Sequence, residues 1–298
     1  HLPTTCRRQR QMCIRDRLTS GTICKGTYFI AQGRIVKSME NSLKDKVAIV
    51  TGGTRGIGKA ITETFLEAGA EVLVCARTLP ETDIGVPDRK AHFINCDVRN
   101  SEDIKEVVEL CQSEYGKLDI LVNNAGGAPP ADSASASEKF TKSIVDLNLI
   151  APMIFSQVAG NLMRASSDSA VIINISSVSG MRPNPFGVAY GAAKAGIINA
   201  TQTLALEWGP EIRVVSISAG LVLTEESRSF YGDDSTVEKI AETIPLGRMG
   251  SPQDVADACL FVASHKAGWL SGSNIVLHGG GERPNYLDAI NHLGSSGP

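Results

Sequence analysis

Four polar side chains stand at positions from which they could carry out chemistry on a carbonyl group. Tyr190 and Lys194 lie four residues apart in a predicted helix over 188–208, so they share one face of that helix. Ser177 ends an apolar predicted strand thirteen residues before Tyr190. A ketone that accepts a hydride develops negative charge on its oxygen and needs a proton donor and a hydrogen-bond donor there. These residue types predict that Tyr190 supplies the proton and Ser177 the hydrogen bond.

Two further side chains are expected to support the phenol of Tyr190. A free phenol titrates about three pH units above neutrality, so it is a poor base without help. We expect the nearby Lys194 cation to lower the pKa of Tyr190, together with an oxidised nicotinamide when one is bound. Asn148, in an earlier helical stretch, is expected to hold a water that links Lys194 to solvent.

A glycine-rich turn follows the first predicted strand and precedes a predicted helix. Its sequence is Thr51-Gly52-Gly53-Thr54-Arg55-Gly56-Ile57-Gly58. Glycines permit a tight turn and let backbone N–H groups approach a pyrophosphate at the helix N-terminus. The spacing is T-G-x-x-x-G-x-G rather than G-x-G-x-x-G. We predict a dinucleotide site whose contacts include Gly52, Thr54, Arg55, Gly56, Ile57 and Gly58.

The end of the second predicted strand favours NADP(H), that is NADPH, over NAD(H). An acid at this place binds a ribose 2′-hydroxyl, whereas an Arg accommodates a 2′-phosphate. The sequence there is Val74-Cys75-Ala76-Arg77, without an acid, and Arg55 supplies a second guanidinium. NAD remains the alternative cofactor. Further cofactor contacts are predicted at the ends of the third and fourth strands, from Asp97, Val98, Asn124, Ala125 and Gly126.

Short β-branched runs alternate with longer helical patterns from Lys46 onward. The predicted strands are Val47–Thr51, Glu71–Cys75, His92–Asn95, Ile120–Val122, Ala170–Ile175, Arg213–Ile217 and Asn274–Leu277. The predicted helices cover 57–68, 101–115, 137–163, 188–208 and 252–264. This alternation implies βαβ units with right-handed crossovers. We predict an α/β fold: a single doubly wound Rossmann-type domain with a seven-stranded parallel sheet and helices on both faces. The loop Ala128–Ser137 is expected at the rim of the site.

Charge is distributed unevenly along the 298 residues. Residues 1–38 hold eight Lys or Arg residues and one acid, whereas residues 39–298 hold 21 basic and 31 acidic residues. The acidic body argues against a nucleic-acid partner held by bulk phosphate attraction. No apolar run approaches the roughly 18 residues that cross a bilayer, so no membrane partner is expected. A hydrophobic fraction of 42% excludes a disordered chain.

The basic residues 1–38 are expected to lie outside the folded domain, which we place at 39–298. Residues 7–17 resemble translated adapter sequence joined to a gene fragment, and Met39 would be a natural start. We therefore predict a disordered or artefactual extension. A transit peptide and a basic tail for nucleic acid or anionic lipid are the alternative interpretations.

Cysteine and histidine usage indicates no metal site and a reducing compartment. The cysteines of the body are scattered singly among apolar neighbours, without C-x-x-C spacing: Cys75, Cys96, Cys111 and Cys259. The five histidines lack metal-ligand spacing. We expect a cytoplasmic protein.

Taken together, these motifs resemble the short-chain dehydrogenase/reductase family over about Ser42–Gly281. The matching elements, in the family's order, are Thr51–Gly58, Asn123–Gly126, Asn148, Ser177 and Tyr190-x-x-x-Lys194, followed by Pro245–Ala256. The resemblance, which is to 3-oxoacyl-thioester or tropinone reductases within the family, implies NAD(P)-dependent oxidoreduction of a small carbonyl or secondary alcohol in a homotetramer or homodimer. It also implies cofactor contacts from Tyr190 and Lys194, and nicotinamide contacts near Val222 and from Thr224.

The chain departs from the family pattern at two positions. Ala219 stands where the family usually has Pro, which leaves the following loop without a fixed φ. His278 stands where Asp is more frequent. Apolar residues after Ser177 and Gly220 are expected to wall a pocket for an alicyclic ketone, a steroid-like ring or a 3-oxoacyl thioester: Val178, Met181, Pro183, Phe186, Leu221, Phe230 and Tyr231.

Three other functions are considered for this sequence. An NAD-dependent alcohol or steroid-type dehydrogenase would need the same catalytic residues. A nicotinamide-binding sensor subunit without turnover would not need an intact Tyr190, Lys194 and Ser177. An isomerase or dehydratase normally needs a larger C-terminal substrate region than the one that follows Thr224.

Overall fold

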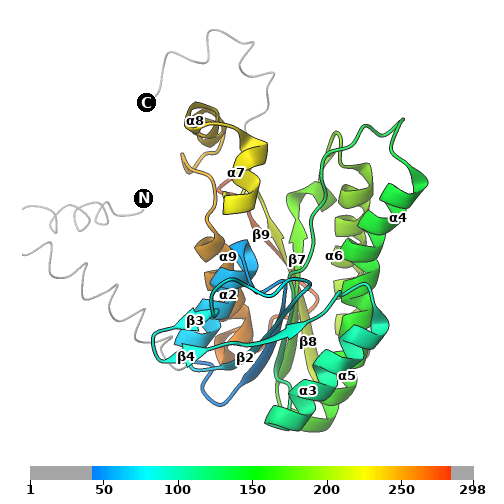
Figure 1. Cartoon of the computed structure of the whole chain (residues 1–298), viewed down its shortest axis with the longest axis vertical. Coiled ribbons are helices and arrows are strands. Elements are labelled where there is room, and N and C mark those ends of the chain that lie inside the picture. Colours follow the sequence, from blue (N-terminus) through cyan, green and yellow to red (C-terminus); the bar gives the residue numbers. More distant parts are fainter. Residues whose placement is uncertain (1–41, 283–298) are drawn as a thin grey trace, which may run out of the picture. The chain divides into compact units, whose positions relative to one another are not determined.

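The computed structural model describes residues 42–282, which form a seven-stranded parallel sheet wrapped by helices (Figure 1). The predicted extension 1–38 lies outside the described residues. The sheet order is β5-β2-β1-β6-β7-β8-β9. Its strands are β1 (Val47–Thr51), β2 (Glu71–Ala76), β5 (His92–Asn95), β6 (Ile120–Asn123), β7 (Ala170–Ser177), β8 (Ile212–Ala219) and β9 (Asn274–Leu277). This order confirms the predicted doubly wound arrangement, because the strand sequence reverses direction next to β1.

Helices connect successive strands of the sheet except β2 and β5, which are joined by a segment that contains a hairpin. The helices are α2 (Gly56–Glu67), α3 (Ser101–Tyr115), α4 (Glu138–Val145), α5 (Ala151–Ser166), α6 (Val188–Trp208), α7 (Glu225–Tyr231), α8 (Asp234–Glu242) and α9 (Pro252–Ala263). Short 3-10 turns η2 and η3 cover Val178–Gly180 and His265–Ala267, and a small hairpin pairs β3 (Gly85–Val86) with β4 (Arg89–Lys90). The hairpin, α7 and α8 were not predicted.

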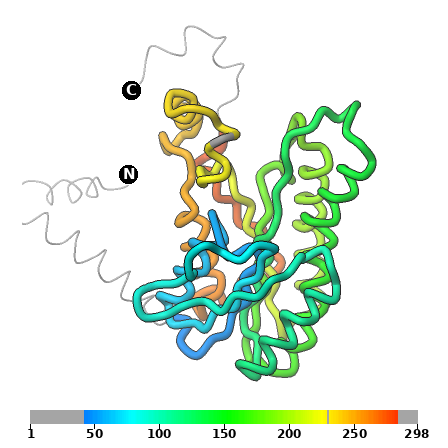
Figure 2. Tube along the Cα trace, in the orientation of Figure 1, coloured from blue at the N-terminus to red at the C-terminus, as the bar shows by residue number. Residues whose placement is uncertain are grey.

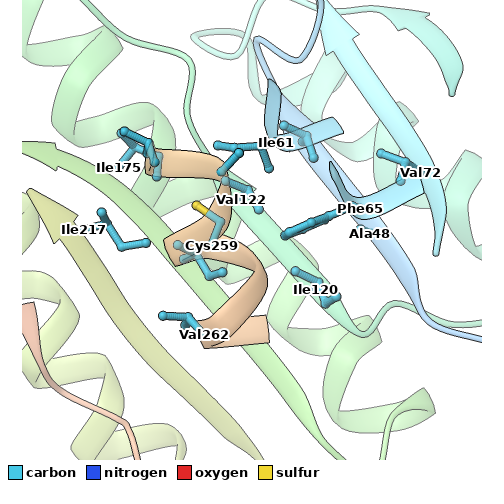
Figure 3. Close-up of a cluster of buried hydrophobic side chains, with 14 of the residues drawn as sticks. Ala48, Ile61, Phe65, Val72, Ile120, Val122, Ile175, Ile217, Cys259 and Val262 are labelled. Carbon is cyan, nitrogen blue, oxygen red and sulfur yellow. The ribbon is translucent and has the colours of Figure 1, made fainter. Parts of the chain in front are cut away.

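Each face of the sheet has its own hydrophobic core, because neighbouring residues of a strand point to opposite faces. On one face, Ala48 and Val50 of β1 pack with Phe65 of α2 and Cys259 of α9 (Figure 3). The α2 and α9 helices, far apart in the sequence, lie side by side over this face (Figure 2). On the other face, Val47 and Ile49 join the cluster formed with α3, α5 and α6.

Several helix ends are set by local sequence. The Asn100 side chain accepts a hydrogen bond from the backbone of Glu102 at the start of α3, and Gly116 ends that helix with φ +72°. Ser251 and Asp254 form a reciprocal capping box at the start of α9, with Pro252 at its first position. Such signals explain the predicted bounds of α3 and the predicted start of α9; α6 also has the predicted bounds, and α9 ends one residue earlier than predicted.

The helix predicted over 137–163 is not α-helical throughout. Residues Asp146–Ile150 form a π-helical turn, η1, between α4 and α5. The Asn148 side chain donates to the Ile144 carbonyl, which would otherwise accept a hydrogen bond along the helix backbone. The predicted helix is therefore continuous from Glu138 to Ser166, but it changes from α-helical to π-helical geometry at this point.

One helical stretch, Glu138–Ser166, is long and apolar enough to cross a membrane by length and composition alone. In the domain, the α5 part of this stretch packs Phe155, Ala159 and Met163 into the second core. The same criterion is met by core helices of globular domains.

Candidate active site

The glycine turn between β1 and α2, here called the cradle, has glycine at positions where another residue would be strained or would clash. Gly52 and Gly56 have φ of +64° and +52°. A Cβ on Gly58 would lie 2.1 Å from the Gly52 carbonyl oxygen. Arg55, the N-cap of α2, makes no side-chain cap, and the first turn of α2 carries no acid. The cradle therefore fits a dinucleotide pyrophosphate, which would meet backbone N–H groups and the positive end of the helix.

The end of β6 braces this turn. The Asn124 amide donates to the carbonyl oxygens of Thr51 and Gly52 at 2.9 and 3.2 Å. The Thr51 hydroxyl accepts from the backbone N–H groups of Asn124 and Ala125 at 2.9 Å each. The Asn124 side chain thus holds the glycine turn in place, and cofactor contact at Asn124 stays a prediction.

The other predicted cofactor residues fall into two groups: residues that follow strand ends and residues that pack against the hydrophobic cores. Arg77 follows β2, and the Asp97 carboxylate follows β5 within electrostatic reach of it. A hydrogen bond from Arg99 is the main cause that lowers the pKa of Asp97, and the charge of Arg77 adds to it. Val98 is buried in the second core and Ile57 packs against the first, so their side chains support the site from behind.

The segment after β8 lies against the glycine turn. Ala219 completes β8 opposite Leu277, and Val222 bridges Gly250. Two residues on, Thr224 caps α7, and a Cβ on Gly56 would lie 3.5 Å from its methyl group. Thr224 thus lies beside the glycine turn, while its contact with the nicotinamide stays a prediction.

Lys194 is buried where α6 crosses β7, with an exposed fraction of 5%. Its ammonium donates to the Ile175 carbonyl at 2.8 Å and lies 5.6 Å from the centroid of the Tyr190 ring. Burial lowers the pKa of Lys194 to about 8. The Ser176 hydroxyl donates to the Lys194 carbonyl at 2.9 Å, and Gly180 packs so closely that a Cβ there would be 2.6 Å from the Lys194 backbone. The strand and the turn after it thereby fix the position of the lysine.

Tyr190 and Ser177 meet at the carboxyl end of β7. Burial raises the pKa of the Tyr190 phenol, and a hydrogen bond with the Ser177 hydroxyl only partly offsets this. We expect Lys194 to lower the pKa of Tyr190, but in the polypeptide alone this pKa is raised, because desolvation of the phenol is the dominant effect. The Ser177 hydroxyl also accepts from the backbone N–H of Ser179 at 3.1 Å.

Asn148 is buried in η1, with an exposed fraction of 1%. Its amide nitrogen donates to the carbonyls of Gly127 and Ile144, and its amide oxygen accepts from the Gly127 N–H, each at 2.9 Å. The side chain is thus committed to the backbone. Pro152, four residues on, lacks an N–H and cannot satisfy the Asn148 carbonyl in the usual helical pattern.

A cavity of about 80 Å³ adjoins Tyr190. Its lining includes Phe186 from the predicted pocket wall and Pro129 from the predicted rim loop. Phe140 and Ile144 of α4 also line it, which the sequence analysis missed. The other predicted wall residues do not line this cavity. A cavity of about 380 Å³ near Arg99 and α4 is lined by charged and polar side chains, none of them a predicted catalytic residue.

Comparisons with known proteins agree with this geometry. A family model described as enoyl-(acyl carrier protein) reductase matches residues 52–282. The 3-oxoacyl-(acyl-carrier-protein) reductase of Chlamydia trachomatis is 35% identical over 254 residues, which cover 81% of this chain and 99% of the relative. The NAD-dependent glycerol dehydrogenase of Listeria innocua is 34% identical over 242 residues, covering 80% and 94%.

Similarity extends to solved structures. The ligand-free aldohexose dehydrogenase of Thermoplasma acidophilum superimposes with a TM-score of 0.76 at 31% identity, covering 81% of this chain and 95% of that one. The relatives thus share more than 30% of their residues with this chain along nearly their whole length. Together with the glycine turn and the Tyr190–Lys194 pair, this similarity shows that the chain belongs to the short-chain dehydrogenase/reductase family, oxidoreductases that bind NAD or NADP and act on alcohol or ketone groups.

Proposed function

We propose that the protein is an NADP(H)-dependent oxidoreductase that interconverts a ketone and a secondary alcohol. The observation that carries this proposal is the contact of the Tyr190 phenol with the Ser177 hydroxyl, with the Lys194 ammonium one helical turn away. When bound, the nicotinamide supplies or accepts the hydride. Tyr190 gives its proton to the substrate oxygen in reduction and takes it back in oxidation, while Ser177 donates a hydrogen bond to that oxygen.

Lys194 and Asn148 would restore the proton on Tyr190. The buried ammonium favours the phenolate that forms when Tyr190 releases its proton. A water on the Asn148 carbonyl, rather than on its committed amide, would link Lys194 to solvent. This assignment moves the predicted role of Asn148 from its side chain to its backbone.

Arg55 and Arg77 support NADP(H) as the cofactor. Arg55 belongs to the glycine turn and Arg77 follows β2, whose last residues, Val74-Cys75-Ala76, include no acid to bind a ribose diol. Asp97 would accept from the adenine amino group, and the backbone of Val222 and the side chain of Thr224 would contact the nicotinamide. NAD is the second candidate because Arg55 already pairs with Glu226, and the similar Listeria enzyme is NAD-dependent.

The apolar cavity beside Tyr190 supports a substrate whose carbonyl end is compact. Its volume of about 80 Å³ is small compared with pockets for drug-sized ligands, which hold roughly 300–1,000 Å³. We propose an alicyclic ketone or a 3-oxoacyl thioester whose remaining part extends past α7. Tyr231 of α7 lies within electrostatic reach of Tyr190 and would line that path.

We also propose that the protein is a homodimer or homotetramer in the cytoplasm. Exposed uncharged residues recur along one face of α6: Val188, Ala192, Ala195, Asn199 and Leu206. Leu206 and Val188 have exposed fractions of 87% and 65%. Such a face is suited to pairing with a second copy, because large exposed apolar side chains in a row are unfavourable in water.

The test is a panel of ketones and 3-oxoacyl thioesters offered with NADPH or NADH and followed at the nicotinamide absorbance. The proposal expects turnover with NADPH to exceed turnover with NADH. Arg77→Ser should weaken NADPH use about tenfold or more while NADH use is unchanged, as expected for loss of a charge-assisted contact. Preference for NADH in the unaltered protein would overturn the cofactor assignment.

A further inference from the structure

The α7 helix brings an acidic side chain onto the glycine turn. One oxygen of the Glu226 carboxylate, Oε1, lies 3.3 Å from Arg55 Nε. The other, Oε2, lies 3.2 Å from the position that a Cβ on Gly56 would occupy. Gly56 is the first residue of α2. A carboxylate of the protein itself therefore lies at the helix N-terminus, where anions are favoured.

The start of α7 fixes this placement. Thr224 and Ser227 form a reciprocal capping box, with hydrogen bonds of 3.0 and 2.7 Å. Ser227 also donates to the Val222 carbonyl at 3.1 Å, which ties the helix to the segment leaving β8. Glu225, the neighbouring acid in the same turn, is exposed and pairs with no residue of the glycine turn in the described part of the chain. Two adjacent glutamates thus differ in what they contact, so a substitution of Glu225 is a matched control for the same substitution of Glu226.

We propose that Glu226 is a specificity-determining residue that competes with the cofactor phosphates for Arg55 and the N-terminus of α2. This inference rests on the proposed function, because it requires the glycine turn to bind a nucleotide. A phosphate bound by Arg55 and the N-terminus of α2 would lie beside this carboxylate and be repelled by it, so nucleotide binding has to displace Glu226 from the turn. Arg55 is the predicted ligand of the 2′-phosphate, so Glu226 weakens NADP binding more than NAD binding.

The same helix reaches the catalytic phenol at its other end. Tyr231, the last residue of α7, lies within electrostatic reach of Tyr190. Its neighbour Phe230 packs edge-on against it, with ring centroids 5.3 Å apart. Displacement of Glu226 by a phosphate would therefore shift Tyr231, which borders the substrate path. Binding of a nucleotide at the glycine turn would in this way change the site next to Tyr190.

The experiment compares Glu226→Gln with Glu225→Gln and the unaltered protein by calorimetric titration with NADP⁺, NAD⁺ and 2′,5′-ADP. The Arg55–Glu226 pair is partly exposed, so its loss should tighten NADP⁺ and 2′,5′-ADP binding about two- to fivefold. NAD⁺ binding should change less, and Glu225→Gln should change neither. The gain should shrink at high salt because the screened pair competes less. Equal or weaker NADP⁺ binding by Glu226→Gln overturns the proposal.

Hydrogen exchange separates this inference from the proposed function. Without added nucleotide, Glu226→Gln should speed exchange of the α7 amides, whereas Glu225→Gln should not. Unchanged exchange in α7 would show that Glu226 does not hold the helix and would overturn the inference. Tighter NADP⁺ binding by Glu226→Gln with no turnover of any ketone overturns the proposed reaction alone. Failure of every variant to bind any of the nucleotides overturns both.

Discussion

The Lys194 ammonium lies 5.6 Å from the centroid of the Tyr190 ring and donates its hydrogen bond to the backbone of β7 rather than to the phenol. We therefore propose that Lys194 acts on Tyr190 through its charge, on the phenolate that forms during the proposed reaction. Because burial brings its pKa to about 8, the ammonium can lose its charge at mildly alkaline pH. The protonation state of this buried lysine would then contribute to the pH dependence of the proposed reaction.

Carbonyl reduction should fall as pH rises through about 8. Below that value Lys194 is charged and favours the phenolate left when Tyr190 gives up its proton; above it the lysine is neutral and this support is lost. The pH profile of kcat/KM in the reductive direction measures this effect. Lys142→Ala, an exposed lysine of α4, should leave the profile unchanged. A profile that stays flat well above pH 8 would contradict the role of Lys194.

Replacing Tyr190 by Phe should reduce turnover by about 10²- to 10⁴-fold, because the proton donor is removed. Nucleotide affinity should be unaffected, since the glycine turn is not altered. Tyr115→Phe is the control: burial also raises the pKa of Tyr115, but it ends α3, away from the β7 end where Ser177 lies. Full activity of Tyr190→Phe would favour the sensor subunit without turnover.

A Gly58→Ala substitution should weaken nucleotide binding strongly. The added Cβ would lie 2.1 Å from the Gly52 carbonyl oxygen and 2.5 Å from the Asn124 amide nitrogen, so the turn has to move. The control is Gly116→Ala at the end of α3, where space is open but φ is +72°. That change should cost about 1–2 kcal/mol of unfolding free energy and leave nucleotide affinity intact. Titration and chemical denaturation of both variants separate the two effects.

Asp119→Asn should lower the unfolding free energy by about 1–3 kcal/mol at neutral pH. The Asp119 carboxylate accepts from the Lys46 ammonium at 2.8 Å, the Val47 N–H at 3.0 Å and the Ser167 hydroxyl at 2.8 Å. Burial raises its pKa, but these donors outweigh burial and the net shift is downward.

The sign of the pH dependence follows from that shift. Because the folded-state pKa of Asp119 lies below the unfolded value, its stabilisation is present above about pH 4 and is lost as pH falls through the folded pKa. The difference between Asp119→Asn and the unaltered protein should shrink over that range in urea denaturation. Asp83→Asn, which removes an exposed pair with Lys90, should change stability by less than about 0.5 kcal/mol. A constant difference down to strongly acidic pH would show that the carboxylate charge is not responsible.

Much of the fold follows from local sequence. Buried parallel strands read as short apolar runs, so β1, β5 and β9 have the predicted bounds. The glycine turn and the Tyr190–Lys194 spacing are local as well, and they place the nucleotide cradle and the catalytic pair. The α7 and α8 helices were missed although Thr224 and Asp233 are good N-caps, because the two helices are short, with seven and nine residues.

Contacts between segments that are distant in the sequence could not be predicted from it. The π turn at Asp146–Ile150 depends on Asn148 bonding Gly127, twenty-one residues away. The direction of the Tyr190 pKa depends on how deeply the phenol is buried, which spacing does not reveal. The Arg55–Glu226 pair joins the first βα turn to the segment after β8. Each of these arises only when the sheet has assembled.

The hydrogen bond from the Ser179 N–H to the Ser177 hydroxyl limits the directions in which this hydroxyl could donate to a substrate oxygen. A serine hydroxyl is a rotor, and its proton ordinarily samples several directions. Here one lone pair is engaged by the backbone N–H of Ser179, and the hydroxyl also interacts with the Tyr190 phenol. The rotation of the hydroxyl is therefore restricted before any ligand arrives. A three-residue turn at the end of β7 thus removes orientational freedom from the proposed donor in advance, so that an arriving carbonyl would not have to organise it.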